Sequence, residues 1–156
     1  MTRIIHGYFK RIPGRRDVAP YLIAHLKWKD VSGYVEFMID TGSSATVILD
    51  RDAIRLGLLK RVRKMEKAER ELRGIGGFAE TYIMRNVELT LVDFKDPENT
   101  ITINLDRIYV ALHMKRFRGE EWKRLTQIPS LLGRDVLLKA SEIIIKDGNV
   151  VELHFH

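Results

Sequence analysis

One short segment constrains this chain more than any other. Three apolar residues, Phe37 to Ile39, run directly into Asp40-Thr41-Gly42-Ser43. The apolar run predicts a buried β-strand, so the carboxylate falls where that strand ends. Such a carboxylate is costly to bury unless it is paired or hydrogen-bonded, and the backbone N–H groups of the following glycine and serine can donate to it. Taken alone, the segment also fits a simple Asx-turn.

Composition sets the wider limits. The chain has 156 residues, a formal charge of +6 and no cysteine. One domain is the default at this length, and without cysteine there is no disulfide scaffold, thiol nucleophile or Cys-ligated zinc site. No apolar run approaches the roughly 20 residues that span a bilayer, and the N-terminal residues lack an apolar signal-peptide core. We therefore expect no membrane partner and a cytoplasmic location.

The excess of basic residues lies in three short clusters, which admit two interpretations. A basic patch can bind phosphate backbones. Acidic residues follow two of the clusters closely, and no zinc-finger, RRM or KH signature accompanies the charge. We therefore favour solvated faces over a nucleic-acid surface. The clusters are Lys10-Arg11 with Arg15-Arg16, Lys60 to Lys64, and Lys115-Arg116 with Arg118.

Two other patterns suggest a cofactor or a metal, and we reject both. Gly74 to Ala79 formally matches a G-x-G-x-x-A dinucleotide loop, but a charged segment precedes it and a strand pattern, not a helix, follows it. We predict a flexible hairpin tip there. His154 and His156 share one face of the last predicted strand, with no third metal ligand evident. We expect no cofactor and no metal.

The pattern of elements is mostly β. Hairpins are predicted at residues 21–39 and 142–155, the second around Asp147-Gly148. Short helices are predicted after Asp50, which could cap the first of them, and after Asp135, whereas residues 115–127 fit either a short helix or an irregular insertion. We divide the chain into a basic arm or edge strand (1–19), a main domain (20–140) and a C-terminal β-hairpin (141–156).

A second motif lies far downstream of Asp40. Residues 128–137, Ile-Pro-Ser-Leu-Leu-Gly-Arg-Asp-Val-Leu, place two apolar residues and a glycine before a predicted helix. The Gly-rich hairpin lies between the two motifs. This ordered set resembles the retropepsin-like (retroviral-type) aspartic proteases, which have an Asp-Thr-Gly loop after an apolar strand, a Gly-rich flap, and an apolar-apolar-Gly strand leading into a helix. The resemblance covers roughly residues 20–140.

The resemblance implies an all-β fold, a closed β-barrel that is half of an acid protease, with a flap hairpin and one or two short helices. It implies an aspartic endopeptidase that hydrolyses polypeptides with water and needs no cofactor. Asp40 matches the catalytic aspartate. Because the chain has no second Asp-Thr-Gly, the resemblance implies a homodimer in which each chain supplies one Asp40. Two such carboxylates share one proton and titrate as a unit.

The resemblance also assigns supporting roles by position. In the family, the hydroxyl at the place of Thr41 crosses to the partner chain and locks the two loops together. A Ser43 hydroxyl bonded to Asp40 would lower the pKa of the pair, so Ser43→Ala is predicted to shift activity to higher pH. The assigned residues are Thr41, Gly42 and Ser43 for the loop, Ile75, Gly76 and Gly77 for the flap, and Leu131, Leu132, Gly133 and Arg134 for the supporting strand and helix start.

Three departures from the retroviral pattern leave questions open. Ser44 stands where retroviral members have an aspartate that pairs with the arginine matching Arg134, so the role of Arg134 is open. Residues 113–128 are predicted to be an insertion that covers the site or a partner surface. The C-terminal hairpin either packs on its own subunit or builds a dimer sheet.

A second function class fits the same fold, namely a catalytically silent retropepsin-fold module for dimerisation or peptide binding. The intact Asp40-Thr41-Gly42 favours the enzyme, because a module without chemistry could lose a costly carboxylate.

Overall fold

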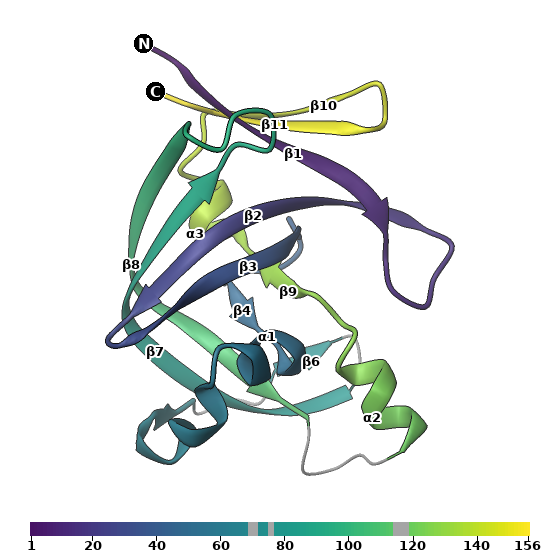
Figure 1. Cartoon of the computed structure of the whole chain (residues 1–156), viewed down its shortest axis with the longest axis vertical. Helices are drawn as coiled ribbons and strands as arrows, with labels where there is room; N and C mark the ends of the chain where they lie inside the picture. The colour runs from purple at the N-terminus through teal and green to yellow at the C-terminus, as the bar shows by residue number, and fades with distance from the viewer. Residues whose placement is uncertain (69–71, 75–76, 114–118) are drawn as a thin grey trace.

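The computed structural model describes residues 1–68, 72–74, 77–113 and 119–156. The chain is built mainly from strands, with a few short helices between them in the sequence (Figure 1). The strands are β1 (Arg3–Arg11), β2 (Val18–Trp28), β3 (Val31–Ile39), β4 (Val47–Ile48), β5 (Glu66–Lys67), β6 (Leu72–Gly74), β7 (Gly77–Val92), β8 (Thr100–Leu112), β9 (Ser130–Leu132), β10 (Glu142–Lys146) and β11 (Val150–Phe155). The helices are α1 (Asp50–Arg55), α2 (Glu120–Leu125) and α3 (Arg134–Leu137), with 3₁₀ turns at Leu58–Lys60 and Val62–Lys64.

The sheet closes into a barrel. Its strand order is β10-β11-β1-β2-β3-β9-β4-β8-β7-β5, and β7 also pairs with β2 from Ile23↔Val92 to Lys27↔Glu88. That extra pairing makes a ring of β2, β3, β9, β4, β8 and β7. Alternate residues of these strands point inward and are fully buried, among them Leu22, Phe37 and Ile108, as a half-buried pleated sheet requires. The prediction of an all-β closed barrel is confirmed.

The short strand β9 positions the site. It lies between β3, with which it pairs in parallel (Phe37↔Ser130 to Ile39↔Leu132), and β4, with which it pairs antiparallel (Val47↔Leu131). Parallel pairing needs a long crossover, and here the chain returns to β3 only after passing through β4, β7, β8 and α2. Residues far apart in the sequence therefore meet where β3 ends.

The two termini form one end of the sheet. β1 pairs with β11 on one side and with β2 on the other, so β1 is an interior strand and the prediction of an edge strand at the N-terminus is wrong. The C-terminal hairpin covers it, because Val151, Leu153 and Phe155 are buried in the chain's own core. The outer strand β10 is the edge, with Ile145 61% exposed.

Three local predictions change in detail. Arg85-Asn86 fits a turn by sequence, but β7 continues through it with an unbroken register against β8, from Met84↔Ile108 to Val87↔Leu105, although the φ of Asn86 is 58°. Asp50 is the first residue of α1 and not its cap, since its carboxylate bonds His113 instead. The insertion contains the helix α2, while residues 114–118 lie outside the described part.

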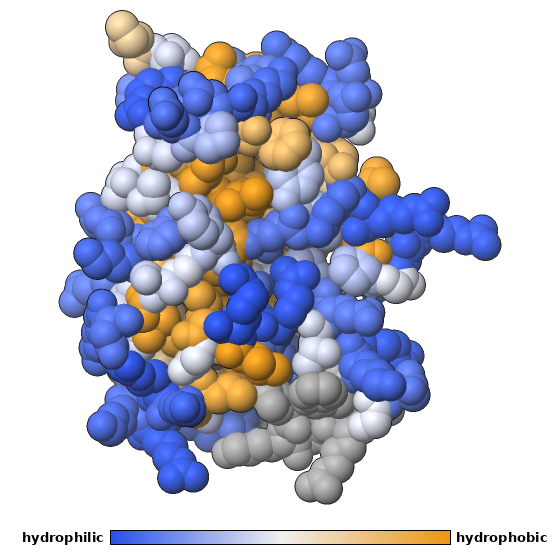
Figure 2. Space-filling model, viewed as in Figure 1, coloured by the Kyte–Doolittle hydropathy of each residue, from blue (hydrophilic) through white to orange (hydrophobic). Residues whose placement is uncertain are grey.

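Hydrophilic residues cover much of the face seen in Figure 2, with hydrophobic residues visible between them toward the middle. Among the described residues, no helix is both long and apolar enough to span a bilayer.

Candidate active site

Asp40 lies where β3 leaves the barrel. Alternation along β3 buries Phe37 and Ile39 in the core cluster and turns Met38 and Asp40 to the opposite face. The Asp40 backbone N–H still donates to the Leu132 carbonyl at 3.0 Å, so the β3–β9 pairing extends to the carboxylate itself. The position of Asp40 is therefore fixed by the end of the buried strand β3 and its pairing with β9.

A tight turn holds the carboxylate. The Gly42 N–H donates to Asp40 Oδ1 at 2.9 Å, and the Ser43 N–H donates to the Asp40 carbonyl at 3.2 Å. A Cβ added to Gly42 would lie 3.2 Å from Asp40 Oδ1, so glycine gives this N–H close access. Among the described residues, no other donor reaches the carboxylate, and Oδ2 has no hydrogen-bond partner.

The hydroxyl of Ser43 does not serve the carboxylate. It donates to the Ala45 carbonyl at 2.7 Å. Because a hydroxyl carries one hydrogen, the predicted Ser43 to Asp40 bond is wrong for this structure, and the pH shift predicted for Ser43→Ala loses its basis. Sequence proximity suggested the bond, but the loop turns the side chain toward the next carbonyl.

The start of α3 anchors the loop from the other side. The Arg134 backbone N–H donates to the Ser43 carbonyl at 2.8 Å, and the Arg134 guanidinium donates to the Thr41 carbonyl at 3.0 Å. The open question about Arg134 thereby has an answer within one chain. With Ser44 in place of an acid, the guanidinium takes a backbone carbonyl as its partner.

Beneath the loop, a buried hydroxyl and a carboxylate join β4 to α3. Asp135 accepts from the Thr46 backbone N–H at 2.9 Å and from the Thr46 hydroxyl at 2.7 Å. The same hydroxyl accepts from the Gly133 N–H at 3.2 Å. A Cβ at Gly133 would lie 2.5 Å from the backbone of Ala45, so only glycine lets β9 pass this close to the loop.

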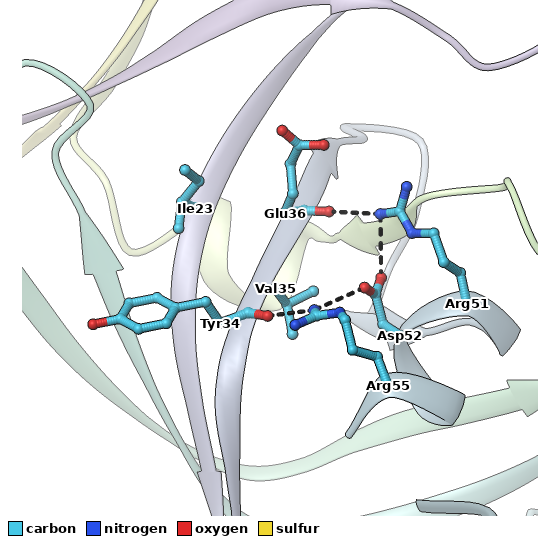
Figure 3. A pocket seen from close by; sticks show the side chains of 7 residues that line it. All are labelled: Ile23, Tyr34, Val35, Glu36, Arg51, Asp52 and Arg55. Atoms are coloured by element: carbon cyan, nitrogen blue, oxygen red, sulfur yellow. Dashed lines mark hydrogen bonds and ion pairs between the residues drawn. The ribbon is translucent and has the colours of Figure 1, made fainter. Parts of the chain in front are cut away.

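A second buried acid joins α1 to β3 and β9. Asp52 is 1% exposed and accepts from the Ser130 hydroxyl at 2.6 Å and from Arg55 at 3.0 Å. Figure 3 shows Arg51 and Arg55 reaching from α1 to this carboxylate and to the backbone carbonyls of Glu36 and Tyr34. Two cations and a hydroxyl satisfy the carboxylate, as a buried charge requires, and brace the strand that ends at Asp40.

The sequence did not indicate these supporting contacts. Thr46 and Asp52 belong to no motif, and the motif that contains Ser130 does not name its partner; Asp52 and Ser130 are 78 residues apart, and Thr46 and Asp135 are 89 apart. The same is true of Asp50, which accepts from the His113 backbone N–H at 2.8 Å and bonds its ring at 2.7 Å. The only available signal was that an acid next to an apolar run needs a partner; nothing said which partner.

The predicted flap falls partly outside the described residues. Ile75 and Gly76 are not described. On either side of them β6 and β7 pair from Leu72↔Ala79 to Gly74↔Gly77, so Gly77 lies in a hairpin at the predicted place. The site residues Leu131, Leu132 and Gly133 lie on or directly after β9, beside β3. No group of three or more His, Asp or Glu side chains that could hold a metal occurs in the described segments.

Comparisons agree with this geometry. The aspartyl protease family model matches residues 26–136, well over half of the chain, and the chain belongs to that family. A retropepsin-like aspartic protease from Rickettsia conorii has 17% sequence identity and a TM-score of 0.52, with coverage of 99% of this chain and 94% of that one. At this identity the likeness concerns the fold, which is retropepsin-like.

Two further structures match at lower similarity. The EIAV protease in an inhibitor complex has 19% identity and a TM-score of 0.43, and the retroviral protease-like domain of Ddi1 from Leishmania major has 16% identity and a TM-score of 0.42. Each alignment covers 83% of this chain and 91% of the other. No match was found among curated protein sequences.

Proposed function

We propose that this protein is a homodimeric aspartic endopeptidase whose active site combines the Asp40 of two chains. The observation that carries the proposal is that only one oxygen of the Asp40 carboxylate has a hydrogen-bond donor among the described residues. This carboxylate is positioned at a strand end, accepts one N–H from Gly42 and keeps one oxygen free, in a chain with a single Asp-Thr-Gly. Catalysis by water between two acids needs a second carboxylate, and a second copy supplies it.

The chemistry follows from the pair. Two facing carboxyls share one proton, since both cannot ionise easily at close range. The ionised Asp40 takes a proton from a water molecule, whose oxygen attacks the peptide carbonyl carbon, while the protonated Asp40 donates to the carbonyl oxygen. Collapse of the tetrahedral species breaks the C–N bond, and the leaving nitrogen takes up the proton that the first Asp40 drew from water. A hydroxyl of the tetrahedral carbon returns its proton to the other Asp40. No metal or cofactor takes part.

The supporting roles follow the family pattern. Thr41 is exposed at the loop, where its hydroxyl can cross to the partner chain. The hairpin at Gly77 closes over the substrate and excludes water. The peptide lies as an added strand, held by its main chain. The outer strand β10 can pair with the same strand of a second chain in a dimer sheet. The cytoplasmic location stays a prediction, which cell fractionation tests.

Peptide cleavage tests the proposal. The purified wild-type chain is assayed on a peptide library between pH 3 and 7 over a range of protein concentrations, with and without pepstatin. We expect cleavage that pepstatin inhibits and whose specific activity rises with concentration as dimers form. Asp40→Asn should abolish cleavage, while the exposed control Asp147→Asn should keep it. Undiminished cleavage by Asp40→Asn would overturn the proposal.

A further inference from the structure

A groove opens beside the catalytic loop, at the two residues that directly follow it. It has a volume of about 1200 Å³ and begins at Ser44 and Ala45. Ile83 and Tyr109, paired across β7 and β8, also line it, together with residues of β5 and α3. We call this the side groove. Its lining residues are Ser44, Ala45, Glu66, Lys67, Ala68, Thr81, Ile83, Asn104, Leu105, Asp106, Arg107, Tyr109, Asp135 and Lys139.

Two of the three carboxylates that line the side groove are already engaged. Asp135 accepts from Thr46 and from the Val136 N–H at 2.9 Å. Glu66 receives two bonds from the Arg85 guanidinium, at 2.8 and 3.0 Å. Arg85 holds the pKa of Glu66 below its usual range, and the guanidinium charge offsets that of the Glu66 carboxylate. Neither carboxylate is available as a partner for a ligand.

The cations of the same groove are not engaged in ion pairs. Lys67 on β5 and Lys139 after α3 are exposed and make no ion pair with any described residue. Arg107 lies over the Tyr109 ring, 5.9 Å from its centroid, with its hydrogen-bond donors unused among the described residues. Asp106 is the one unengaged carboxylate of the described lining. Among the described lining residues, Lys67 and Lys139 therefore remain as cations without an ion pair, and Arg107 contacts the Tyr109 ring.

We propose that the side groove takes an acidic side chain of the substrate peptide and makes the enzyme prefer Glu or Asp at a position outside the scissile bond. The proposal rests on the proposed endopeptidase function and names the class of substrate for it. Lys139, just after α3, and Lys67, on β5, are the specificity-determining residues. Their ammonium groups make no ion pair with a described residue and would bond the carboxylate of the substrate side chain.

The extended conformation of the substrate limits which of its positions the side groove can select. Successive side chains of an extended peptide alternate between its two faces. A groove on one side of the catalytic loop therefore selects charge at one position, or at two positions separated by one residue, and leaves the residues between them unselected. A general attraction to basic protein would instead favour acidic residues at every position.

Matched octapeptides test the inference. Two central apolar residues stay constant, and each outer position is in turn Glu, Gln or Lys. We expect kcat/KM to favour Glu over Gln by about three- to fivefold at one outer position, which is the size of a partly exposed ion pair. The preference should fall with added salt and disappear in the double variant Lys67→Glu/Lys139→Glu. The control Lys60→Glu, exposed and outside the groove, should keep it.

Binding separates this inference from the function on which it rests. Fluorescence polarisation measures binding of the same labelled octapeptides to Asp40→Asn, which needs no chemistry. Charge-selective binding without cleavage by the wild type would support the groove and overturn the endopeptidase. Cleavage with equal rates for Glu and Gln, or a preference that survives the double variant, would overturn the groove alone. Absence of any peptide binding would overturn both.

Discussion

The Arg134 guanidinium donates to the Thr41 carbonyl oxygen at 3.0 Å, which ties the start of α3 to the loop that carries Asp40. We predict that Arg134→Ala lowers kcat/KM by about tenfold, because small displacements of a catalytic group are costly in rate. The free energy of unfolding should change by less than about 1 kcal/mol, since the contact is exposed. Peptide kinetics and urea unfolding measure the two effects, with Arg63→Ala as the exposed control. Equal kinetics for the two variants would contradict this role.

Asp135 is predicted to stabilise the fold and not to take part in the chemistry. Asp135→Ala leaves the Thr46 N–H and hydroxyl without their acceptor, which should cost roughly 2–4 kcal/mol of stability. Asp135→Asn keeps one acceptor oxygen and should cost about half as much. Urea unfolding at neutral pH gives both values, and equal losses for the two variants would count against the account.

Alanine substitutions at Gly133 and Gly42 are predicted to have different effects, the first on stability and the second on activity. Gly133→Ala forces a Cβ to within 2.5 Å of the Ala45 backbone, so it should destabilise the protein by roughly 3 kcal/mol or more. Gly42→Ala places its Cβ at 3.2 Å from Asp40 Oδ1, so it should lower activity while the fold is kept. Thermal unfolding and peptide cleavage distinguish the two. A stable Gly133→Ala protein would contradict the close packing of β9 on the loop.

Protonation of Asp93 is predicted to lower the free energy of unfolding at acid pH. Burial alone would raise the pKa of Asp93, but bonds from Asn99, from the backbone N–H groups of His6 and Lys95, and from the His6 ring together hold it below the usual value. A lowered folded pKa gives stability that is present above about pH 4 and is lost as pH falls through the folded pKa. Asp93→Asn should therefore be less stable than the wild type at pH 6, with the gap closing toward pH 2 in urea unfolding. A gap that stays constant over this range would contradict it.

Ser43→Ala is predicted to leave the pH profile of cleavage where it is. The Ser43 hydroxyl donates to the Ala45 carbonyl and not to Asp40, so its loss should cost about 1 kcal/mol of stability without acting on the catalytic carboxyl directly. A profile of kcat/KM against pH checks this. A shift to higher pH would show that the hydroxyl bonds Asp40 in the working enzyme.

The sequence predicted what depends on local pattern. The strand that ends at Asp40 and the hairpin at Asp147-Gly148 carry an apolar run or turn residues, and the short strand before Gly133 was implied by the family resemblance; each lies where it was expected. The family resemblance added the order in which these pieces close a barrel. The local patterns are short-range, and the family resemblance is carried by short motifs.

What could not be predicted depends on long-range contacts. Nothing near Asp52 indicates that Ser130 is its partner, and nothing near Ser43 indicates that its hydroxyl turns to Ala45. β1 was expected at an edge because its sequence is polar and basic, but the C-terminal hairpin covers it. Such contacts are set by how strands distant in the sequence pair, which local propensity does not encode.

The central claim, that two chains share one active site, is tested most directly by mixing. Wild-type chains are allowed to exchange with an equal amount of Asp40→Asn, and cleavage is measured per wild-type chain. If each dimer needs both carboxylates, half of the wild-type chains become trapped in inactive mixed dimers, so activity per wild-type chain falls to about half. Activity per wild-type chain that stays unchanged on mixing would show that one Asp40 suffices and would contradict the account.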